Sequence, residues 1–344
     1  MRKMSRVAVD TELLKGHSHT YAITSRRPFA YGRVSVLYEA KAPTGDIVAA
    51  KLFKQEPRDA NDQPAFDEFF RELDAQGHLK HPNILPVVDY GASESGQQPF
   101  VVYQFCRGGN LRDFMRERQY VPLNDALPIL HQIAAAIDYA HSRGFIHGDV
   151  KPENVLFRDV SHVYLSDFGM ARHFAFTARV STVTGGEIGG TTAYLSPEEL
   201  AQGKQSTRSD LYSFGLVAFE LLTGRLPFEL NAPLYQQIKC KVEGSLLNPA
   251  DANPGLARGV VAALQNVLNA DPHRRPASAT AFCALLASDT PITVAMKTAE
   301  TASERRGTWA SLDSTAKAGI IGAAIAAAAG IIAALINILP DLFK

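Results

Sequence analysis

The feature that most constrains the fold is the polar stretch from His147 to Phe157, which is followed by Asp167-Phe168-Gly169. Asp149 and Asn154 lie close together in this stretch, which contains Pro152 and shows no helical period. A proline in a segment without periodicity is typical of a loop. We therefore expect a loop that can turn the carboxylate and the amide toward one point.

Two short apolar runs follow this loop and indicate how it reaches Asp167. Residues 155–157 and 163–165, separated by a turn-like segment, predict a β-hairpin with Asp167 at the end of its second strand. Carboxylate and amide oxygens are the ligands that Mg²⁺ prefers when it is also held by phosphates. Asn154 and Asp167 are therefore candidate metal ligands, and Asp149 would be left to accept a proton.

At these residues the chain resembles the eukaryotic-type (Hanks-type) protein kinases, in their bacterial membrane-anchored form. The resemblance implies Asp149 as the catalytic base, Asn154 and Asp167 as Mg²⁺ ligands, and Lys151 as a cation near the transferred phosphate. Lysine two positions after the base is typical of the serine/threonine branch. Gly148 replaces the arginine that usually meets a phosphate on the activation loop, and this departure puts phosphorylation-dependent activation in doubt.

The resemblance covers about residues 20–287 and implies an α+β, two-lobed protein kinase fold, with a small β-rich N-lobe and a larger helical C-lobe. Lys51 closes an apolar strand, as does the kinase lysine that pairs with the α- and β-phosphates of ATP. Glu72 lies on a helix predicted over 64–80, where the family has the glutamate that pairs with this lysine. For Glu72 taken alone, the alternative is a solvated surface charge.

The glycine-rich loop that covers the nucleotide in these kinases would fall at residues 30–35, where Gly32 is the one family glycine that remains. This loss keeps open the alternative of a nucleotide-binding protein without catalysis. The residues that the resemblance places around the nucleotide are Gly32, Leu37, Ala49, Lys51, Tyr103, Gln104, Cys106 and Leu156.

Two segments show the apolar stripe of an amphipathic helix, residues 125–142 and 208–223. By resemblance, Asp210 at the start of the second helix would brace the catalytic loop. Arg275 resembles the partner of Glu198, so the two would form a buried ion pair.

Between Asp167 and Glu198 the chain is rich in Thr, Ser and Gly, which predicts a long loop. Residues 190–198 resemble the end of the activation loop, which in these kinases receives the peptide. Thr191 would orient Asp149, and the hydroxyls upstream of it are candidate autophosphorylation sites.

Composition limits the class of protein. A hydrophobic content of 46% in 344 residues allows a large core. With 35 basic and 35 acidic side chains, no net field favours nucleic acid as a partner. The three cysteines show no metal-like spacing, and the lead-in over residues 1–18 has no apolar signal-peptide core. We therefore expect reduced thiols in a cytoplasmic domain.

The C-terminal part has a different character. Residues 288–317 resemble a linker, residues 318–339 contain no charged side chain, and residues 340–344 form a short tail. As a helix, 318–339 would be ~33 Å long and could cross a bilayer core of ~30 Å. A buried or partner-binding helix is the alternative, because many of its residues are alanine.

Two further features bear on this segment. Gly322, Ala326 and Gly330 recur every fourth residue, a spacing that lets two membrane helices approach closely and suggests a homodimer. Arg305, Arg306 and Lys317 precede the segment, which favours a single-pass membrane protein with its kinase domain facing the cytoplasm.

The sequence therefore predicts a protein kinase domain over 19–287 that transfers the γ-phosphate of ATP to Ser or Thr hydroxyls of protein substrates. Its cofactors would be ATP and Mg²⁺, with Mn²⁺ as an alternative metal. It would also phosphorylate itself and be tethered to a membrane through 318–339. The main alternative is a nucleotide-binding pseudokinase scaffold at the membrane. A small-molecule kinase of the same fold is disfavoured by the peptide-receiving segment 191–198.

Overall fold

The computed structural model describes residues 13–25, 27–31, 35–53, 73–74, 76–93, 98–168 and 192–288. They belong to two compact units, Met1–Arg107 and Gly108–Lys344. The described part of the first unit is mainly β-sheet and that of the second mainly helix, as expected for the two lobes. Most of the helix predicted over 64–80 lies outside the described residues.

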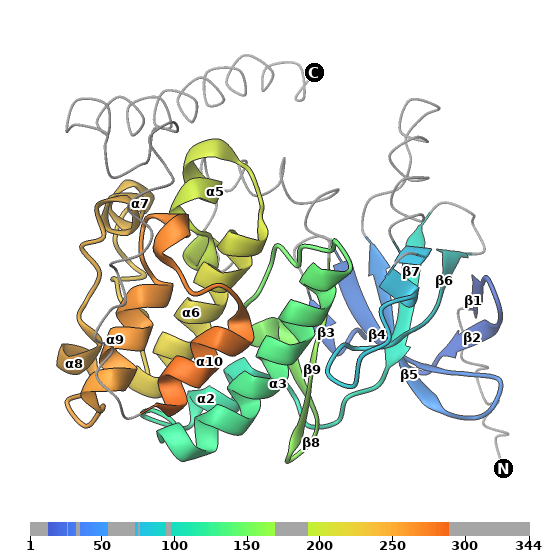
Figure 1. The fold of residues 1–344 in the computed structure, drawn as a ribbon. Helices are drawn as coiled ribbons and strands as arrows, with labels where there is room; N and C mark the ends of the chain where they lie inside the picture. The colour runs from blue at the N-terminus through green and yellow to red at the C-terminus, as the bar shows by residue number, and fades with distance from the viewer. Residues whose placement is uncertain are drawn as a thin grey trace, which may run out of the picture. The chain divides into compact units, whose positions relative to one another are not determined.

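The first unit is built on a seven-stranded antiparallel sheet in the order β2-β1-β6-β7-β5-β4-β3 (Figure 1). An additional pairing of β2 with β4 closes six of these strands into a ring. Its strands are β1 (Leu13–Gly16), β2 (Thr20–Ile23), β3 (Ala30–Tyr31), β4 (Ser35–Lys41), β5 (Ile47–Phe53), β6 (Val87–Ser93) and β7 (Pro99–Gln104).

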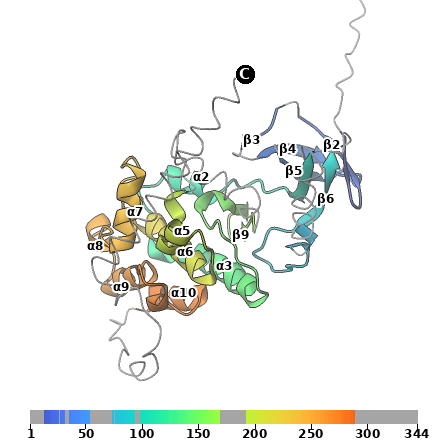
Figure 2. The ribbon, with the colours of Figure 1, turned by 90° about the horizontal axis from the view of Figure 1, so that it is seen from above.

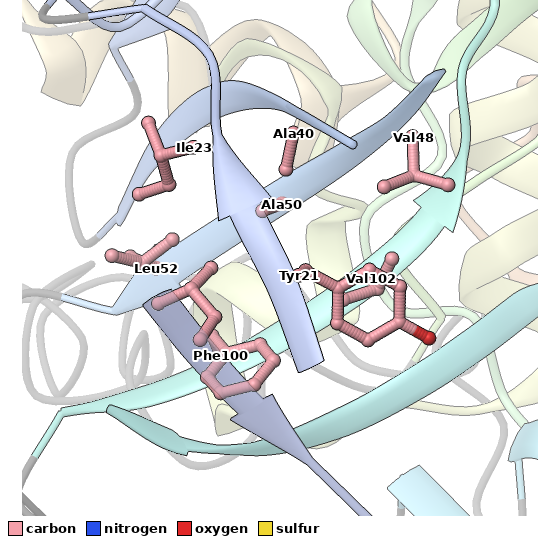
Figure 3. Close-up of a cluster of buried hydrophobic side chains, with 9 residues drawn as sticks. Tyr21, Ile23, Ala40, Val48, Ala50, Leu52, Phe100 and Val102 are labelled. Atoms are coloured by element: carbon pink, nitrogen blue, oxygen red, sulfur yellow. The ribbon is translucent and has the colours of Figure 1, made fainter. Parts of the chain in front are cut away.

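The inside of this ring is a hydrophobic core, which Figure 3 shows in close-up. Successive side chains of a strand point to opposite faces, so alternate residues of β5 and β7 face this core. The buried members of the cluster are Leu14, Tyr21, Ile23, Ala40, Val48, Ala50, Leu52, Phe100 and Val102. The intervening residues of β5 and β7 therefore point to the outer face of the sheet, away from this core.

The pairing of β1 with β2 was not expected, because the lead-in over residues 1–18 shows no periodicity and so did not predict β1. Asp89 of β6, which is 4% exposed, fastens this hairpin to the sheet. Its carboxylate accepts hydrogen bonds from the backbone N–H groups of Ser18 and His19 and from the hydroxyl of Tyr21. Burial and the neighbouring Asp89 carboxylate raise the pKa of Tyr21, which therefore remains a donor.

The second unit contains a long helix that is buried on all sides. Helix α6 (Thr207–Thr223) packs against α3 and α9, and α10 packs against α3 and α9 in turn (Figures 1 and 2). Every residue from Ser209 to Thr223 is buried. The sequence predicted a helix with one apolar face. From Ser209 to Thr223, however, every face of the helix is buried.

The second unit contains further helices and one short hairpin, whose bounds are as follows. They are α2 (Leu111–Arg116), α3 (Leu123–Ser142), η1 (Pro152–Asn154), β8 (Val155–Asp159), β9 (His162–Leu165), η3 (Thr192–Tyr194), α5 (Pro197–Gln202), α7 (Leu234–Glu243), α8 (Pro249–Ala252), α9 (Arg258–Val267), η4 (Pro272–Arg274) and α10 (Ala279–Ala287). The predicted helix over 125–142 and the predicted hairpin after the polar loop are both confirmed, as α3 and as β8–β9.

Within the ranges that the structure describes, no helix combines the length and the apolar character needed to cross a membrane. The predicted membrane segment 318–339 lies outside those ranges, as does most of the linker over 288–317.

Candidate active site

Asp210 of α6 holds the loop before β8 through hydrogen bonds to its backbone. The two carboxylate oxygens of Asp210 accept hydrogen bonds from the backbone N–H groups of His147 and Gly148, each at 2.8 Å. Asp210 is 1% exposed and also lies 2.7 Å from Nε2 of His141. The prediction that Asp210 braces this loop is confirmed.

His147 fixes the loop from inside. Its Nδ1 accepts the backbone N–H of Asp149 at 3.1 Å, and its Nε2 donates to the carbonyl of Ser166 at 2.9 Å. One acceptor and one donor nitrogen correspond to the neutral ring. Burial lowers the pKa of His147, which favours this form. His147 thereby connects the loop to the residue before Asp167, and its ring lies 4.4 Å from that of Phe168.

Asp149, Lys151 and Asn154 form one cluster at the end of this loop. The Lys151 ammonium lies 2.7 Å from the Asp149 carboxylate. The Asn154 amide nitrogen donates to the Asp149 carbonyl at 2.8 Å and to its carboxylate at 3.1 Å. Because the nitrogen of Asn154 is used in this way, its amide oxygen is left for a metal. Asp149 itself is only partly buried.

Asp167 lies just beyond β9, in an unusual backbone conformation. Among the described residues it is the one non-glycine residue with a positive φ, at 65°. Such conformations cost energy and concentrate at functional sites. The preceding residue, Ser166, donates to the carbonyl of Asn154 through both its N–H and its hydroxyl. These two bonds tie the backbones of the two predicted metal-binding residues together.

These side chains suit Mg²⁺ bound together with phosphates better than a metal bound by protein alone. Within the described residues no group of three or more His, Cys, Asp or Glu side chains could hold a metal ion. Mg²⁺ commonly takes one or two protein oxygens and completes its shell with phosphates and water. The oxygens of Asn154 and Asp167 fit that requirement.

In the first unit, four of the predicted nucleotide-binding residues lie on the outer face of the sheet. Leu37 of β4 is paired with Lys51 of β5, and Ala49 of β5 with Tyr103 of β7. Directly paired residues share a face, and residues two apart on a strand share it too. Leu37, Ala49, Lys51 and Tyr103 therefore lie together, opposite the core of Figure 3. Lys51 is only 8% exposed.

The other predicted nucleotide-binding residues lie outside this group on the outer face of the sheet, or outside the described residues. Gln104 ends β7 and is exposed, and Cys106, which is partly buried, follows it in the connection to the second unit. Leu156 of β8 is partly buried in the second unit and forms a bridge with Asn110. The predicted Gly32, Glu72 and Thr191 lie outside the described residues.

Gln205 is a site residue that sequence reasoning missed. Its side-chain amide donates to the carbonyl of Gly148 at 3.0 Å. Gly148 has a φ of +74°, and a Cβ there would lie 2.5 Å from Nε2 of Gln205. The position where the family usually has arginine is therefore filled by a side chain from the loop before α6. No local motif marks Gln205, because its role comes from the fold.

A second missed group surrounds Tyr194. The hydroxyl of Tyr194 donates to Glu220 of α6 and accepts from Arg112 of α2. Arg112 also pairs with Glu220 at 2.5 Å and with Glu153 of the catalytic loop at 2.9 Å. These contacts link the segment before α5 to the loop that carries Asp149.

The ion pair of Arg275 with Glu198 is confirmed. The guanidinium donates to both carboxylate oxygens, at 2.7 and 2.8 Å, and the Arg275 side chain is 0% exposed. It also donates to the backbone carbonyls of Asn269 and Arg208. Bidentate geometry with additional acceptors is the arrangement in which a buried pair is well compensated.

Comparison with known families identifies the fold that carries this site. A model described as the protein kinase domain matches residues 27–286. The probable serine/threonine-protein kinase PknB of Lactococcus lactis is 35% identical over 222 residues, covering 64% of this chain and 34% of the relative. The serine/threonine-protein kinase PknL of Mycobacterium tuberculosis is 37% identical over 198 residues, covering 57% and 48%.

A third relative extends the match. The serine/threonine-protein kinase pkn2 of Myxococcus xanthus is 34% identical over 270 residues, or 76% of this chain and 32% of the relative. The chain thus spans about a third to a half of the length of these curated relatives.

Solved structures agree on the fold. The PknI kinase domain of Mycobacterium tuberculosis is 25% identical with a TM-score of 0.59, covering 78% of this chain and 96% of the other. Rad53 residues 1–466, solved in complex with AMP-PNP, is 28% identical with a TM-score of 0.61, covering 76% and 64%.

Proposed function

This chain belongs to the protein kinase domain family, and we propose on that premise that it transfers the γ-phosphate of Mg²⁺–ATP to serine or threonine hydroxyls of other proteins. The observation that carries the proposal is the cluster of Asp149, Lys151 and Asn154, three side chains of one loop within hydrogen-bonding distance. The serine/threonine kinase names of the relatives support the choice of acceptor.

Each residue of the cluster has a distinct task. Asp149 accepts the proton of the attacking hydroxyl, and Lys151 stabilises negative charge on the transferred group. Asn154 and Asp167 would hold Mg²⁺, which would supply positive charge to the phosphate oxygens. By resemblance to the family, Lys51 would bind the α- and β-phosphates, and Glu72, which lies outside the described residues, would hold Lys51 in place. Catalysis thus rests mainly on positioning and electrostatic stabilisation.

Asp149→Asn in the full chain is the test of this proposal. Loss of the general base should lower turnover by ~10²-fold or more while the melting temperature stays within a degree or two. The measurement is transfer of labelled phosphate from Mg²⁺–ATP to casein and to the chain itself, followed by mapping of the labelled residues. Asp251→Asn, an exposed aspartate of α8, is the matched control and should retain full turnover.

Two outcomes would decide against the proposal. Near-wild-type turnover in a folded Asp149→Asn protein would remove the assignment of the base. If the wild type binds ATP but labels neither casein nor itself, the pseudokinase scaffold becomes the better hypothesis, since the depleted glycine-rich loop around Gly32 already points that way.

We also propose that residues 318–339 form a helix that tethers the catalytic domain to a membrane. Two copies of this helix would pair. The support is the sequence alone, namely the uncharged stretch and the four-residue spacing of Gly322, Ala326 and Gly330. We further propose autophosphorylation at hydroxyls of residues 177–192. Mapping of the labelled residues in the assay above tests this autophosphorylation.

A further inference from the structure

The second unit buries a lysine that no role described so far explains. Lys241 of α7 is 1% exposed and ranks among the largest fully buried side chains of the described residues. Taking an ammonium group out of water is costly unless its protons find acceptors. A buried lysine on the face of a short helix is therefore retained only where specific partners hold it.

The partners of Lys241 are backbone carbonyls. Its Nζ donates to the carbonyl of Ala193 at 2.6 Å and to that of Leu195 at 2.8 Å. The ammonium also lies 4.8 Å from the ring of Phe228, within cation–π distance. Burial lowers the pKa of Lys241 to about 7, and the nearby Glu199 carboxylate opposes this shift.

The carbonyl of Tyr194, which lies between those of Ala193 and Leu195, also accepts a hydrogen bond from a buried side chain. Ser213 of α6 donates its hydroxyl to the carbonyl of Tyr194 at 2.8 Å. Three consecutive carbonyls, those of Ala193, Tyr194 and Leu195, thus accept hydrogen bonds from buried side chains of two different helices. Side chains far away in the sequence therefore set the backbone conformation of this segment.

The neighbouring bonds leave this segment little freedom. The Tyr194 side chain is buried, and its hydroxyl bonds to Glu220 and Arg112. At its C-terminal end, Ser196 and Glu199 form a reciprocal capping box that starts α5. Lys241 supplies the two bonds that join this segment to α7.

We propose that Lys241 is a positioning residue that holds Ala193–Leu195 in the conformation that binds the protein substrate. The proposal rests on the kinase function given above and on the resemblance of residues 191–198 to the segment that receives the peptide. Ala193 and Tyr194 are each 3% exposed and fix the backbone, whereas Leu195 is partly exposed and is the residue of the three that can meet the substrate. Because Lys241 and Ser213 hold the three carbonyls beforehand, binding does not have to pay for ordering this segment. Lys241 acts through the backbone and does not touch the nucleotide.

Lys241→Met tests the proposal, because methionine keeps most of the length of the side chain and removes its donors. In the full chain we expect the KM for casein to rise about tenfold, while the KM for ATP changes less than about twofold, as expected when only the substrate-binding segment loses its order. Lys239→Met, an exposed lysine of the same helix, is the matched control and should change neither value. Unchanged KM values in Lys241→Met would overturn the proposal, and so would an equal loss for both substrates, which indicates a merely structural role.

A readout that needs no activity separates this proposal from the proposed function. Hydrogen exchange of the amides in 193–199 should be at least about tenfold faster in Lys241→Met, with α3 unchanged, because exchange reports local opening. Ser213→Ala, which removes the middle bond, should give a smaller effect of the same sign and stands in if Lys241→Met does not fold. A wild type without phosphate transfer would contradict the proposed function, whereas unchanged exchange in these variants would refute the role of Lys241.

Discussion

At the scale of single residues, Gly148 shows how the fold settles a question that the motif left open. A Cβ at this position would meet the left-handed backbone penalty and would displace the terminal amide of Gln205, which lies 2.5 Å away. Gly144 provides a comparison, because it has a φ of +80° but open space around the position of a Cβ. The two glycines therefore separate the cost of backbone strain from the cost of a steric clash.

We predict that Gly148→Ala destabilises the protein more than Gly144→Ala does. Both variants carry the left-handed penalty of about 1–2 kcal/mol, and Gly148→Ala adds about 0.5–1.5 kcal/mol, because the displaced Gln205 amide loses its hydrogen bond to the Gly148 carbonyl. Urea denaturation of both variants measures the difference. In a Gln205→Ala background, which already lacks this hydrogen bond, Gly148→Ala should lose most of the excess, and equal destabilisation of the two single variants would show that Gln205 yields at no cost.

The second residue-scale prediction concerns pH. The pKa of Lys241 is lowered from 10.5 to about 7 by burial, so between these values the folded state binds fewer protons than the unfolded state. Stability attributable to Lys241 should therefore rise with pH across this window, and the full cost of the buried charge is present below it. Glu199 is the charged group that acts against this shift.

The comparison with Lys241→Met isolates this effect. From about pH 7 to 9 the unfolding free energy of the wild type should gain on that of the variant by up to about 1.4 kcal/mol per pH unit. Parallel pH profiles would show that the lysine is not titrating in this range. The two unsatisfied carbonyls in the variant add an offset that does not depend on pH.

At the scale of elements, one carboxylate adds polar bonds that attach the hairpin of β1 and β2 to the rest of the sheet in the first unit. Asp89 accepts from the N–H groups of Ser18 and His19 and from the hydroxyl of Tyr21. A Cβ on Gly16 would lie 2.3 Å from this carboxylate, so β1 approaches it closely. The hairpin of β1 and β2 is thus attached by one buried and several part-buried polar bonds as well as by the core.

We predict that Asp89→Ala lowers the unfolding free energy by about 3 kcal/mol, because the buried hydroxyl of Tyr21 and the part-buried N–H groups of Ser18 and His19 lose their acceptor at about 1 kcal/mol each. Tyr21→Phe removes one of these bonds and should cost only about 1 kcal/mol. Chemical denaturation followed by a probe in the first unit measures both. A loss from Asp89→Ala no larger than that from Tyr21→Phe would contradict the anchoring role.

Elements were predictable from sequence where the signal is local. The strands of β8 and β9 and the helix α3 follow from apolar runs and turn residues, and both were expected. The hairpin of β1 and β2 was not, because its attachment depends on Asp89, which is distant in sequence. The full burial of α6 also escaped prediction, because small and polar residues such as Ser209, Ser213 and Gly215 leave an amphipathic pattern on a helix that neighbours cover from all sides.

At the scale of the whole molecule, the motif predicted the fold better than any periodicity did. The loop with Asp149 and Asn154 pointed to one family, and the family model over 27–286 confirms it. The same reasoning could not find Lys241 or Gln205, since each acts on a backbone segment far away in the sequence. The Asp149 cluster was thus predictable, and the side chains that hold backbone in place were not.

The membrane segment is the remaining whole-molecule prediction. If 318–339 spans a bilayer, the full chain should stay with membranes after alkaline carbonate extraction. Ala328→Arg puts a charge near the centre of the segment, which costs about 2.5–3.5 kcal/mol on insertion scales, and should shift the chain toward the soluble fraction. Ser314→Arg adds the same charge outside the segment and should leave extraction unchanged. Release of the wild type by carbonate would favour the buried or partner-binding helix instead, since neither depends on a bilayer to hold the chain.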